Sequence, residues 1–474
     1  MTDLLAALEA VAGTANVRAR HEVNDDDTHD EAVTGTPVVP LAVVRPATTD
    51  EVSEILALAD AHRVPVVARG SGTGLSGAAR PHAEGIVIAF DRMSRVLEVD
   101  EENHVAVVQP GVTLAELDAV LAPSGFVYPV YPGEMSATIG GNVSTNAGGM
   151  RAVRYGVTRH HVLGLEMVLA GGQVLRTGGK YVKSSSGYDL TQLVVGSEGT
   201  LALVTEATLK LTPRLAHRGT LLAPFAALEQ IAAAVPPLLR TGVAPLMLEY
   251  IDALSMGGIT EAAGLDLGIP EEVLAKSAAY LVVVLESTHA TRLEADVEAV
   301  ASLLDERGAF DVYVLPPTSG AALITARERA FHVAKALGVD DIVDTVVPRA
   351  EIPRFLAEAS RLAEVHGALV TGCGHVGDGN VHFSVFQPDV ERRKSLLDEI
   401  FAAAVAMGGA VSGEHGIGTE KQRYYLALET PAKLGLMRRI KAAFDPHGIL
   451  GPERQLGGAA LDRGVVPSPE AAAR

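Results

Sequence analysis

The chain has 474 residues, too many for one compact hydrophobic core, so we expect two or more domains. Its composition is that of a globular protein, and a formal net charge of −19 argues against nucleic acid or an anionic membrane surface as a partner. The single cysteine, Cys373, excludes an internal disulfide and any iron–sulfur cluster held by cysteines of this chain.

The N-terminal region predicts a short helix, then an Asp-rich stretch, HEVNDDDTHDE, with ordered structure beginning near residue 37. TTDEVSEILALADAHR predicts an amphipathic helix, in which Thr48 and Glu51 have the spacing of a capping box. Thr113 and Glu116 mark the start of another helix in the same way.

The segment up to about residue 213 predicts many short strands with glycine-rich connections. We expect strands at PVVA, GIVIAF, RVLEV and HVAVVQ, and a hairpin formed by LGLEMVL and QVLRT. From about residue 218 the strands GTLLA, PLMLEYI, YLVVVLE and FDVYVL alternate with Ala- and Leu-rich helices, which predicts a sheet with helices on one face. Residues 457–474 are expected to form a disordered tail.

Apolar runs such as YLVVVL are too short to span a bilayer, so we expect no transmembrane segment. The first residues lack the basic and apolar regions of a secretion signal, so a cytoplasmic location is expected.

Three glycine-rich loops carry small polar side chains. ARGSGTGLSGAA directly follows a strand, and its glycines allow backbone N–H groups to converge on a phosphate. YPGEMSATIGGNVSTNAGGMRAVRYG and VVGSEGTLALVTEATLKL supply hydroxyl and amide groups that can surround a large polar ligand. One such loop is commonly only a surface loop, but three together favour one extended cofactor.

A dinucleotide fingerprint, Gly-x-Gly-x-x-Gly, occurs at residues 72–77. No amphipathic helix follows it, and PHAEGIVIAF returns to a strand, so a Rossmann βαβ unit is disfavoured.

The stretch GHVGDGNVHF and the later loop SGEHGIG together suggest a metal site. His375, His382 and Glu414 supply two imidazoles and a carboxylate, a ligand set suited to a divalent ion with open positions. The Asp-Gly pair at residues 378–379 predicts a tight turn that brings the two histidines to adjacent strand ends. From the hairpin alone, two histidines that are merely hydrogen-bonded remain the simpler interpretation.

Five motifs in order, ARGSGTGLSGAA, ATIGGNVSTNAGG, SSSGYDLTQLVVGSEGTLALVTEATLKL, GHVGDGNVHF and SGEHGIGTEKQRY, carry a resemblance over about residues 37 to 455. The chain resembles FAD-linked oxidases and dehydrogenases of the vanillyl-alcohol oxidase and para-cresol methylhydroxylase superfamily. Within that superfamily it is most similar to D-lactate dehydrogenase, the glycolate oxidase flavin subunit and D-2-hydroxyglutarate dehydrogenase.

The resemblance implies an α+β fold with a defined domain order. An N-terminal helix and polar segment (residues 1–36) would precede an FAD-binding domain of two subdomains, of the para-cresol methylhydroxylase type (residues 37–215). A C-terminal cap or substrate domain, an antiparallel sheet covered by helices, would occupy residues 216–456, and the C-terminal segment would return to the FAD-binding domain.

The resemblance also implies which residues hold FAD. The pyrophosphate cradle would be Arg69, Gly70, Ser71, Gly72, Thr73, Gly74 and Leu75. The flavin would be lined by Pro132, Gly133, Thr138, Gly140, Gly141, Asn142, Ser144 and Gly148, and the adenosine half by Glu198, Gly199, Leu201 and Val204. Some relatives attach the flavin to a histidine of the first loop; here that loop offers only serines and a threonine, so non-covalent FAD is expected.

For catalysis, the resemblance implies a zinc or manganese ion at His375, His382 and Glu414, with hydride passing from the substrate to flavin N5. A metal that holds the hydroxyl and carboxylate of a 2-hydroxy acid lowers the hydroxyl pKa, and His415 is then the candidate general base. Arg327 is the candidate fork for the substrate carboxylate. An exposed helix arginine paired with Glu328 is the alternative interpretation.

The expected activity is therefore FAD-dependent oxidation of a small D-2-hydroxy acid, of the D-lactate or glycolate type, to the 2-oxo acid. Hydroxyglutarate enzymes hold the distal carboxylate with a threonine and a lysine, where this chain has Phe331 and Ile342. Neither side chain can bind a carboxylate, which favours glycolate, D-lactate or a longer apolar 2-hydroxy acid.

Two alternative functions remain open from the sequence. One is a flavin-dependent transferase similar to alkylglycerone-phosphate synthase, and the other is the flavin subunit of a multi-subunit glycolate oxidase. A dehydrogenase also needs a separate electron acceptor, namely a quinone pathway, an electron-transfer flavoprotein, a cytochrome or oxygen, which could place the protein peripherally at a membrane. A homodimer is compatible with the sequence.

Three further residues have open roles. Lys421 and Arg423 either face the substrate or a flavin phosphate, or begin a solvated helix. Cys373 is expected to be buried rather than reactive.

Overall fold

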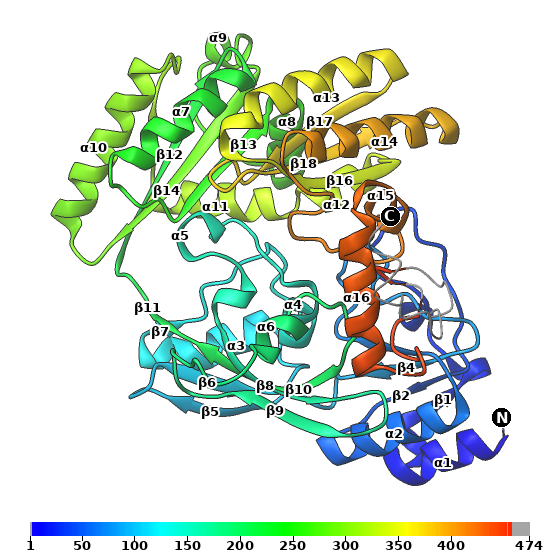
Figure 1. The fold of residues 1–474 in the computed structure, drawn as a ribbon. Coiled ribbons are helices and arrows are strands. Elements are labelled where there is room, and N and C mark those ends of the chain that lie inside the picture. The colour runs from blue at the N-terminus through cyan, green and yellow to red at the C-terminus, as the bar shows by residue number, and fades with distance from the viewer. Residues whose placement is uncertain (1, 453, 457–474) are drawn as a thin grey trace, which may run out of the picture.

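The structure is a computed structural model that describes residues 2–452 and 454–456. Two bodies of helices and strands are stacked in Figure 1, with the N-terminal half below and the segment from about residue 217 to residue 428 above. The predicted tail, residues 457–474, lies outside the described residues.

The first subdomain is a four-stranded sheet in the order β1–β2–β4–β3. Strands β2, β4 and β3 are parallel, and β1 pairs antiparallel with β2. Helices α1 and α2 cover it through a cluster that includes Leu8, Ile55 and Ile88. The bounds are β1 Val17–Ala19, β2 Ala42–Val44, β3 Val66–Arg69, β4 Ile86–Ala89, α1 Thr2–Ala12 and α2 Thr49–His62.

The Asp-rich segment is ordered, contrary to the expectation that order begins near residue 37. Asp27 is buried, and its carboxylate lies 3.2 Å from Arg18, 3.8 Å from Arg45 and 3.9 Å from Arg69. Because these arginines come from separate parts of the chain, Asp27 contacts them only once the chain has folded, and this part of the acidic run packs into the first subdomain.

The second subdomain is a five-stranded antiparallel sheet in the order β5–β6–β10–β8–β9. It contains the predicted hairpin of β8 and β9. Its strands are β5 Val96–Asp100, β6 Val105–Val108, β8 Val162–Val168, β9 Val174–Gly178 and β10 Leu203–Lys210. The core beneath it is shared with α3 Leu114–Leu121 and α4 Ile139–Thr145. The two small sheets confirm the two-subdomain architecture.

The two predicted helix starts differ in detail. Thr113 and Glu116 form a complete capping box, with each side chain accepting a backbone N–H of the other residue. Thr48 accepts from Glu51 N, but the Glu51 carboxylate accepts from Ala47 N instead.

The upper body is a seven-stranded sheet in the order β15–β12–β14–β13–β17–β18–β16, in which every neighbouring pair is antiparallel. This confirms the predicted antiparallel cap. Its strands are β12 His217–Phe225, β13 Met247–Asp252, β14 Ala279–Ser287, β15 Tyr313–Leu315, β16 Asp341–Val346, β17 Leu369–Gly374 and β18 Asn380–Phe386.

Helices cover both faces of the cap sheet, not one as the strand–helix pattern suggested. The long helices α7 Leu228–Arg240, α10 Ala290–Glu306, α13 Ile352–His366 and α14 Val390–Ala406 share one core with the sheet. The opposite face packs with α8 Ala253–Ala263, α11 Pro317–Glu328 and α12 Ala330–Ala336. Both faces are apolar, as Leu221 and Leu222 of β12 illustrate, because each belongs to a different one of these cores. Near-continuous runs of apolar residues, such as those in these strands, are typical of a sheet that is buried on both faces.

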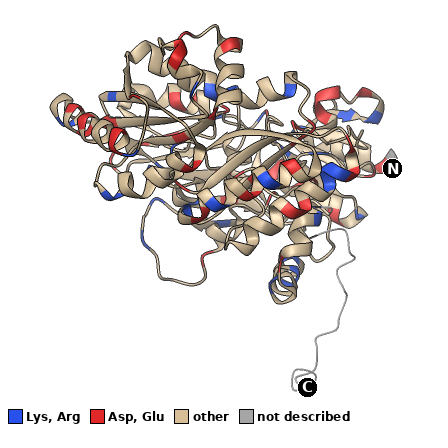
Figure 2. Cartoon of the chain, turned by 90° about the horizontal axis from the view of Figure 1, so that it is seen from above, with Lys and Arg blue, Asp and Glu red and all other residues tan. Residues whose placement is uncertain are grey.

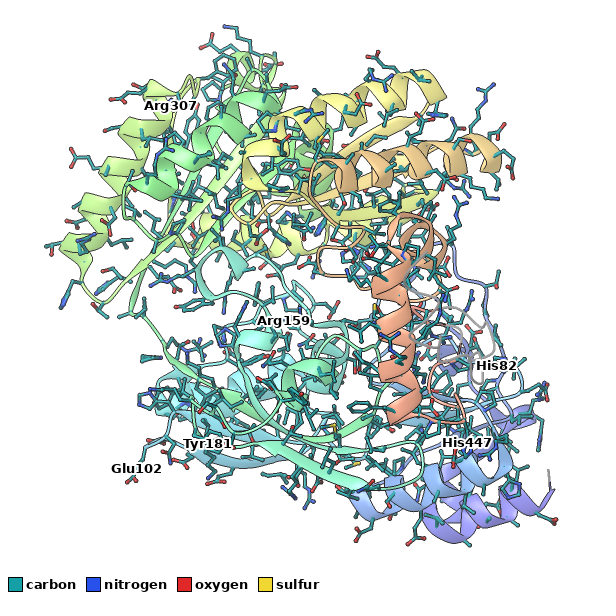
Figure 3. All side chains as sticks on the ribbon, viewed as in Figure 1. His82, Glu102, Arg159, Tyr181, Arg307 and His447 are labelled. Atoms are coloured by element: carbon teal, nitrogen blue, oxygen red, sulfur yellow. The ribbon has the colours of Figure 1, made fainter. Side chains whose placement is uncertain are left out.

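The C-terminal segment returns to the first subdomain, as expected. Helix α15 (Gln422–Leu428) lies at the cap, and α16 (Pro431–Phe444) runs from there toward the lower body. Leu450 then forms a bridge with Val66 of β3, and His447, labelled in Figure 3, lies 2.7 Å from Asp60 of α2. The cap therefore sits between two segments that belong to the lower body.

The remaining α-helices and strands are short. They are α5 Ala152–Tyr155, α6 Leu190–Val194, α9 Glu271–Leu274 and a two-stranded sheet of β7 Phe126–Val127 and β11 Thr212–Pro213. Across the described chain, no helix has the length and apolarity that crossing a membrane requires. Figure 2 shows acidic and basic residues interspersed over the helices.

Candidate active site

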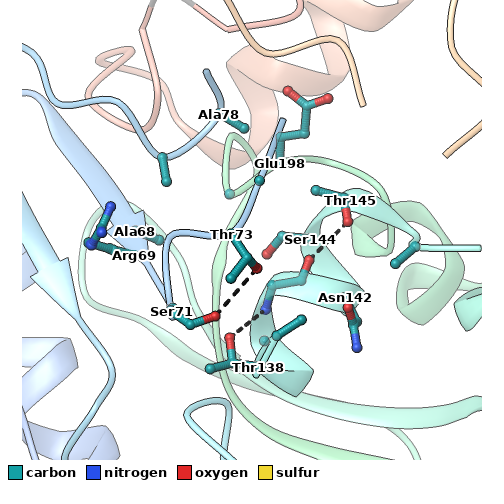
Figure 4. A pocket seen from close by; sticks show the side chains of 18 of the residues that line it. Ala68, Arg69, Ser71, Thr73, Ala78, Thr138, Asn142, Ser144, Thr145 and Glu198 are labelled. Carbon is teal, nitrogen blue, oxygen red and sulfur yellow. Dashed lines mark hydrogen bonds between the residues drawn. The ribbon is translucent and has the colours of Figure 1, made fainter. Parts of the chain in front are cut away.

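The three glycine-rich loops meet in one cleft between the two lower subdomains and the cap. The first loop leaves β3, the second leads into and out of α4, and the third connects α6 to β10. The cleft encloses about 1240 Å³ including its open mouth. Figure 4 shows Ser71, Thr73, Thr138, Asn142 and Glu198 around it.

Most of the predicted cofactor residues line this cleft. They are Arg69, Gly70, Ser71, Gly72, Thr73, Gly74, Leu75, Pro132, Thr138, Gly140, Gly141, Asn142, Ser144, Gly148, Glu198, Gly199 and Val204. Two others do not. Gly133 lines a neighbouring cavity instead, and the Leu201 side chain packs into the core of the second subdomain.

The first loop offers an array of unused donors. The backbone N–H groups of residues 70–75 donate no hydrogen bond to any described residue. A Cβ at Gly70 would lie 2.1 Å from Thr138 Oγ1, so only glycine allows the loop to approach α4 this closely. Deeper in the cleft, Asn142 Nδ2 is buried with no partner among the described residues. Such an array suits an anionic, polar ligand.

A second cavity adjoins the cleft beneath the cap sheet. It encloses about 1250 Å³ with its mouth and is walled by α8, the end of α11, α12 and strands β16, β17 and β18. Four residues line both spaces: Leu75, Pro132, Glu414 and His415. The Glu-His pair therefore stands at the junction.

The hairpin brings His375, His382 and Glu414 together. Strands β17 and β18 pair with Cys373 opposite His382, and residues 375–379 form the turn. Glu414 Oε1 lies 3.1 Å from His375 Nε2 and 3.3 Å from His382 Nε2. The three ligand atoms lie within 4.8 Å of one another.

Asp344 of β16 holds the loop that carries Glu414. It is fully buried, and its carboxylate accepts from the Ser412 hydroxyl and from the backbone N–H groups of residues 413–415. Lys421 Nζ lies 3.1 Å from the same carboxylate. Burial opposes the ionised form of Asp344, but Lys421 and the nearby imidazoles hold its pKa well below the usual range. Lys421 is thus in a buried ion pair, facing neither substrate nor solvent.

Glu249 of β13 supports His375 from behind. Its carboxylate is fully buried and lies 2.6 Å from His375 Nδ1 and 3.1 Å from Arg327 Nη2. Burial by itself would lower the pKa of His375, but Glu249 and Glu414 raise it well above its usual value.

Arg327 is buried at the end of α11 and lines the second cavity. The expected alternative, an exposed arginine paired with Glu328, does not hold, since the Glu328 carboxylate accepts from the Tyr131 hydroxyl. Arg327 Nε has no hydrogen-bond partner among the described residues. One edge of the guanidinium thus remains available to an anion in this cavity.

His415 lies where the two spaces join. Its ring is 4.9 Å from that of His382, between centroids, and its Nδ1 is buried without a hydrogen-bond partner among the described residues. Burial lowers the pKa of His415 to about 3, so the imidazole is neutral at physiological pH.

A further carboxylate from the cleft side fixes the same loop. Glu198, in the left-handed region with φ 53°, accepts from the backbone N–H groups of Ile417 and Gly418 at 2.6 and 2.8 Å. The loop with Glu414 and His415 is thus held by Asp344 on one side and Glu198 on the other.

Comparison with known proteins identifies the two bodies. Residues 40–178 match the family model "FAD binding domain", and residues 214–454 match "FAD linked oxidases, C-terminal domain". The chain belongs to the FAD-linked oxidase family. It is an oxidoreductase that binds FAD, and the glycine-lined cleft is called the flavin cleft below.

Relatives and solved structures agree with this assignment. The chain is 54% identical over 452 residues to the Uncharacterized FAD-linked oxidoreductase Rv2280 of Mycobacterium tuberculosis, covering 95% of this chain and 98% of the relative. It is 38% identical over 416 residues to D-lactate dehydrogenase of Archaeoglobus fulgidus, covering 86% and 90%. Substrate-bound p-cresol methylhydroxylase has the same fold, with a TM-score of 0.77, 18% identity and 96% of each chain covered.

The flavin cleft fits FAD on its own features. The unpaired N–H groups of residues 70–75 suit a pyrophosphate, and the unpartnered amide of Asn142 suits a polar edge of the cofactor. The cleft opens at His415 into the second cavity, where a substrate could reach the cofactor.

The His375–His382–Glu414 set fits a divalent ion. Ligand atoms on a tetrahedral zinc lie roughly 3.3 Å apart when the bonds are 2.0–2.1 Å, close to the observed separations. The ligand atoms of a second set, Asp344, His382 and His415, also lie within 4.8 Å of one another. It fits less well because the Asp344 carboxylate already accepts several hydrogen bonds and pairs with Lys421.

Sequence reasoning missed Glu249 and Asp344. Each is an acid inside a strand of apolar residues, in PLMLEYI and DIVDTVV. A charged side chain inside a buried strand needs an ion-pair or hydrogen-bond partner, so the position of these two acids could have marked them as functional candidates.

Two other predicted residues lie outside the cluster. Arg423 is partly exposed and pairs with Asp398 at 3.2 Å, which agrees with the solvated helix start, and Cys373 is buried as expected.

Proposed function

We propose that the protein is an FAD-dependent dehydrogenase that oxidises a D-2-hydroxy acid to the 2-oxo acid. The observation that carries this proposal is the junction of the flavin cleft with a second cavity at Glu414 and His415. That cavity also holds an arginine with a free donor edge and two imidazoles beside a carboxylate. A 2-hydroxy acid has the groups that match this arrangement: a carboxylate, a hydroxyl and a hydrogen on the carbon between them.

Arg327 and His415 are the proposed substrate-binding and proton-accepting residues. Arg327 binds the substrate carboxylate through its free Nε edge, while Glu249 keeps the guanidinium in place. His415 accepts the proton of the substrate hydroxyl, since it lines both spaces and its Nδ1 has no hydrogen-bond partner among the described residues. Asp344 and Glu198 keep His415 in position through the backbone of its loop.

His375, His382 and Glu414 are the proposed ligands of a divalent ion, zinc or manganese. Glu249 orients His375 so that its Nε2 faces Glu414, where the two side chains would hold the ion. When bound, FAD supplies the acceptor for the substrate's hydride, and the ion supplies positive charge that lowers the pKa of the substrate hydroxyl.

The proposal also covers the configuration of the substrate, the way FAD is held and the electron acceptor. The D configuration is supported by the similarity to D-lactate dehydrogenase of Archaeoglobus fulgidus. FAD is held non-covalently, because the residues lining the flavin cleft include no cysteine or tyrosine and only one histidine, the proposed base. The electrons then pass to a separate acceptor, since the chain has one cysteine and cannot hold an iron–sulfur cluster through cysteines.

Substitution of the proposed ligands tests this function. His382→Ala and Glu414→Ala should keep FAD bound while losing the metal and turnover with a dye acceptor, as measured by visible absorbance, metal analysis and dye reduction. His62→Ala, on the exposed end of α2, serves as the control. Wild-type turnover in either ligand variant would refute the role of this cluster.

A further inference from the structure

The second cavity is much longer than a small hydroxy acid requires. Its floor is the β17–β18 hairpin, in which Cys373 pairs with His382 at one end and Leu369 with Phe386 at the other. Four residues along a strand span about 13 Å. The reacting groups all lie at the His382 end, so most of this length extends away from the chemistry.

The floor of that extension is uncharged. Alternate residues of a strand share one face, and those facing the cavity beyond His382 are Leu369, Thr371, Ser384 and Phe386. The Thr371 hydroxyl donates to the Asp252 carboxylate at 2.7 Å, so its hydrogen is already used.

The walls are largely apolar, although Ser255 of α8 also lines the cavity. Helix α8 contributes Leu254 and Ile259, and the α12 region contributes Phe331, Val333 and Leu337. Ile342 of β16 completes the wall. Leu254 and Leu337 are 63% and 68% exposed, although exposing an apolar leucine side chain to water costs free energy. A ligand chain in the cavity would cover them.

The charged lining is confined to one end. Arg327 is the one arginine among the residues that line this cavity, and no lysine is present among them. It serves the carboxylate next to the reacting carbon. A second carboxylate, as in 2-hydroxyglutarate, would therefore be desolvated beside leucine and phenylalanine without a cationic partner among the residues that line the extension.

We propose that the substrate is a 2-hydroxy acid with an extended alkyl chain, of the size of 2-hydroxyhexanoate or 2-hydroxyoctanoate, whose chain lies along the β17–β18 hairpin between α8 and α12. This inference rests on the proposed function, because the carboxylate and hydroxyl occupy the Arg327 and His415 end. The chain fills the apolar extension and covers Leu254 and Leu337.

A chain-length series tests the proposal. The metal-replete holoenzyme is mixed anaerobically with glycolate and the D forms of lactate, 2-hydroxybutyrate, 2-hydroxyhexanoate, 2-hydroxyoctanoate and 2-hydroxyglutarate, and flavin bleaching is followed by stopped flow. Each methylene buried should increase the specificity constant of reduction about fourfold, which is roughly sixtyfold from lactate to hydroxyhexanoate. Hydroxyglutarate should be a poor substrate.

The outcomes separate the two proposals. A flat or falling series in which lactate or glycolate reduces the flavin as well as hydroxyhexanoate would overturn the alkyl-chain proposal and leave the proposed function intact. A flavin that none of the acids reduces would overturn the proposed function itself.

Variants at the cavity mouth supply a second test. Leu254→Asn and Leu337→Asn change polarity at nearly constant size, and both positions are exposed, so folding should be preserved. Each should lower the ratio of the hydroxyhexanoate to the lactate specificity constant several-fold. Leu436→Asn, on α16 and 50% exposed, is the control away from the cavity and should leave the ratio unchanged. An unchanged ratio in both cavity variants would contradict the proposal.

Discussion

Glu249 Oε1 lies 2.6 Å from His375 Nδ1, so a fully buried carboxylate fixes the imidazole whose other nitrogen faces Glu414. A carboxylate behind a ligating histidine sets its tautomer and its orientation. This contact ties the cap strand β13 to the proposed metal set and explains why an acid is buried there.

Replacing this carboxylate should weaken metal binding without affecting the flavin. In Glu249→Gln, the His375 ring loses its charged partner, and metal affinity should fall about 10- to 100-fold. Competition with a zinc chelator measures this affinity, and the flavin-to-protein absorbance ratio should stay at the wild-type value. Unchanged metal affinity would mean that Glu249 serves only Arg327.

The glycine at the start of the first loop should be essential for FAD. In Gly70→Ala, the new Cβ would meet Thr138 Oγ1 at 2.1 Å, which forces the loop away from α4. The purified variant should contain little FAD and bind added FAD at least about tenfold more weakly, a loss expected when two or three cradle hydrogen bonds fail. Fluorescence titration of the apoprotein with FAD measures this.

Gly257→Ala is the matched control for that substitution. Gly257 lies inside α8 with nothing within 4 Å of a built Cβ, so alanine should leave FAD affinity unchanged and stabilise the helix slightly. Normal FAD content in Gly70→Ala would show that the loop can shift without losing the cofactor.

Glu198 is expected to act as a positioning residue for His415. Glu198→Gln keeps one acceptor but turns an amide N–H toward the backbone donors of Ile417 and Gly418. The rate of flavin reduction at saturating substrate should fall about 10- to 100-fold, since losing a charge-assisted bond costs about 1.5–3 kcal/mol. Glu206→Gln, on β10 and paired with Arg176, is the control. A change in KM alone would contradict a positioning role.

A pH-dependent effect on stability is expected at Asp341. Burial raises the pKa of this carboxyl to about 6, above the value near 4 of the unfolded chain. The folded state therefore holds the proton more tightly, and stability falls as pH rises from about 4 to 6 and is then constant.

Asp341→Asn should remove the fall in stability between about pH 4 and pH 6, because the amide does not ionise. Its oxygen can still accept from Ile342 N. The variant should raise the midpoint of thermal unfolding by a few degrees at pH 8, equivalent to about 1–3 kcal/mol, and by less at pH 5. A shift of equal size at both pH values would point to a cause other than titration of this group.

The sequence predicted the elements whose signals are local. The hairpin of β17 and β18 followed from strand composition and an Asp-Gly turn, and it placed His375 and His382 side by side. The antiparallel cap and the two lower subdomains followed from the strand pattern together with the family resemblance.

What the sequence could not provide were contacts between distant segments. Glu249 is 126 residues from His375, and they meet only because β13 pairs with β17. The same holds for Asp27, whose three arginine neighbours come from different strands and loops. A local sequence pattern can predict that a charged side chain is buried, but the order of the strands in the sheet determines which residue pairs with it.

The proposed function requires that a D-2-hydroxy acid reduce the flavin, with His415 accepting the proton of the hydroxyl. An anaerobic visible spectrum of the metal-replete holoprotein, before and after addition of D-2-hydroxyhexanoate, D-lactate or glycolate, tests it most directly. At least one of these acids should bleach the flavin bands rapidly, and the L form of hydroxyhexanoate should not bleach them. A flavin that stays oxidised with all three acids would contradict it and would favour the transferase alternative.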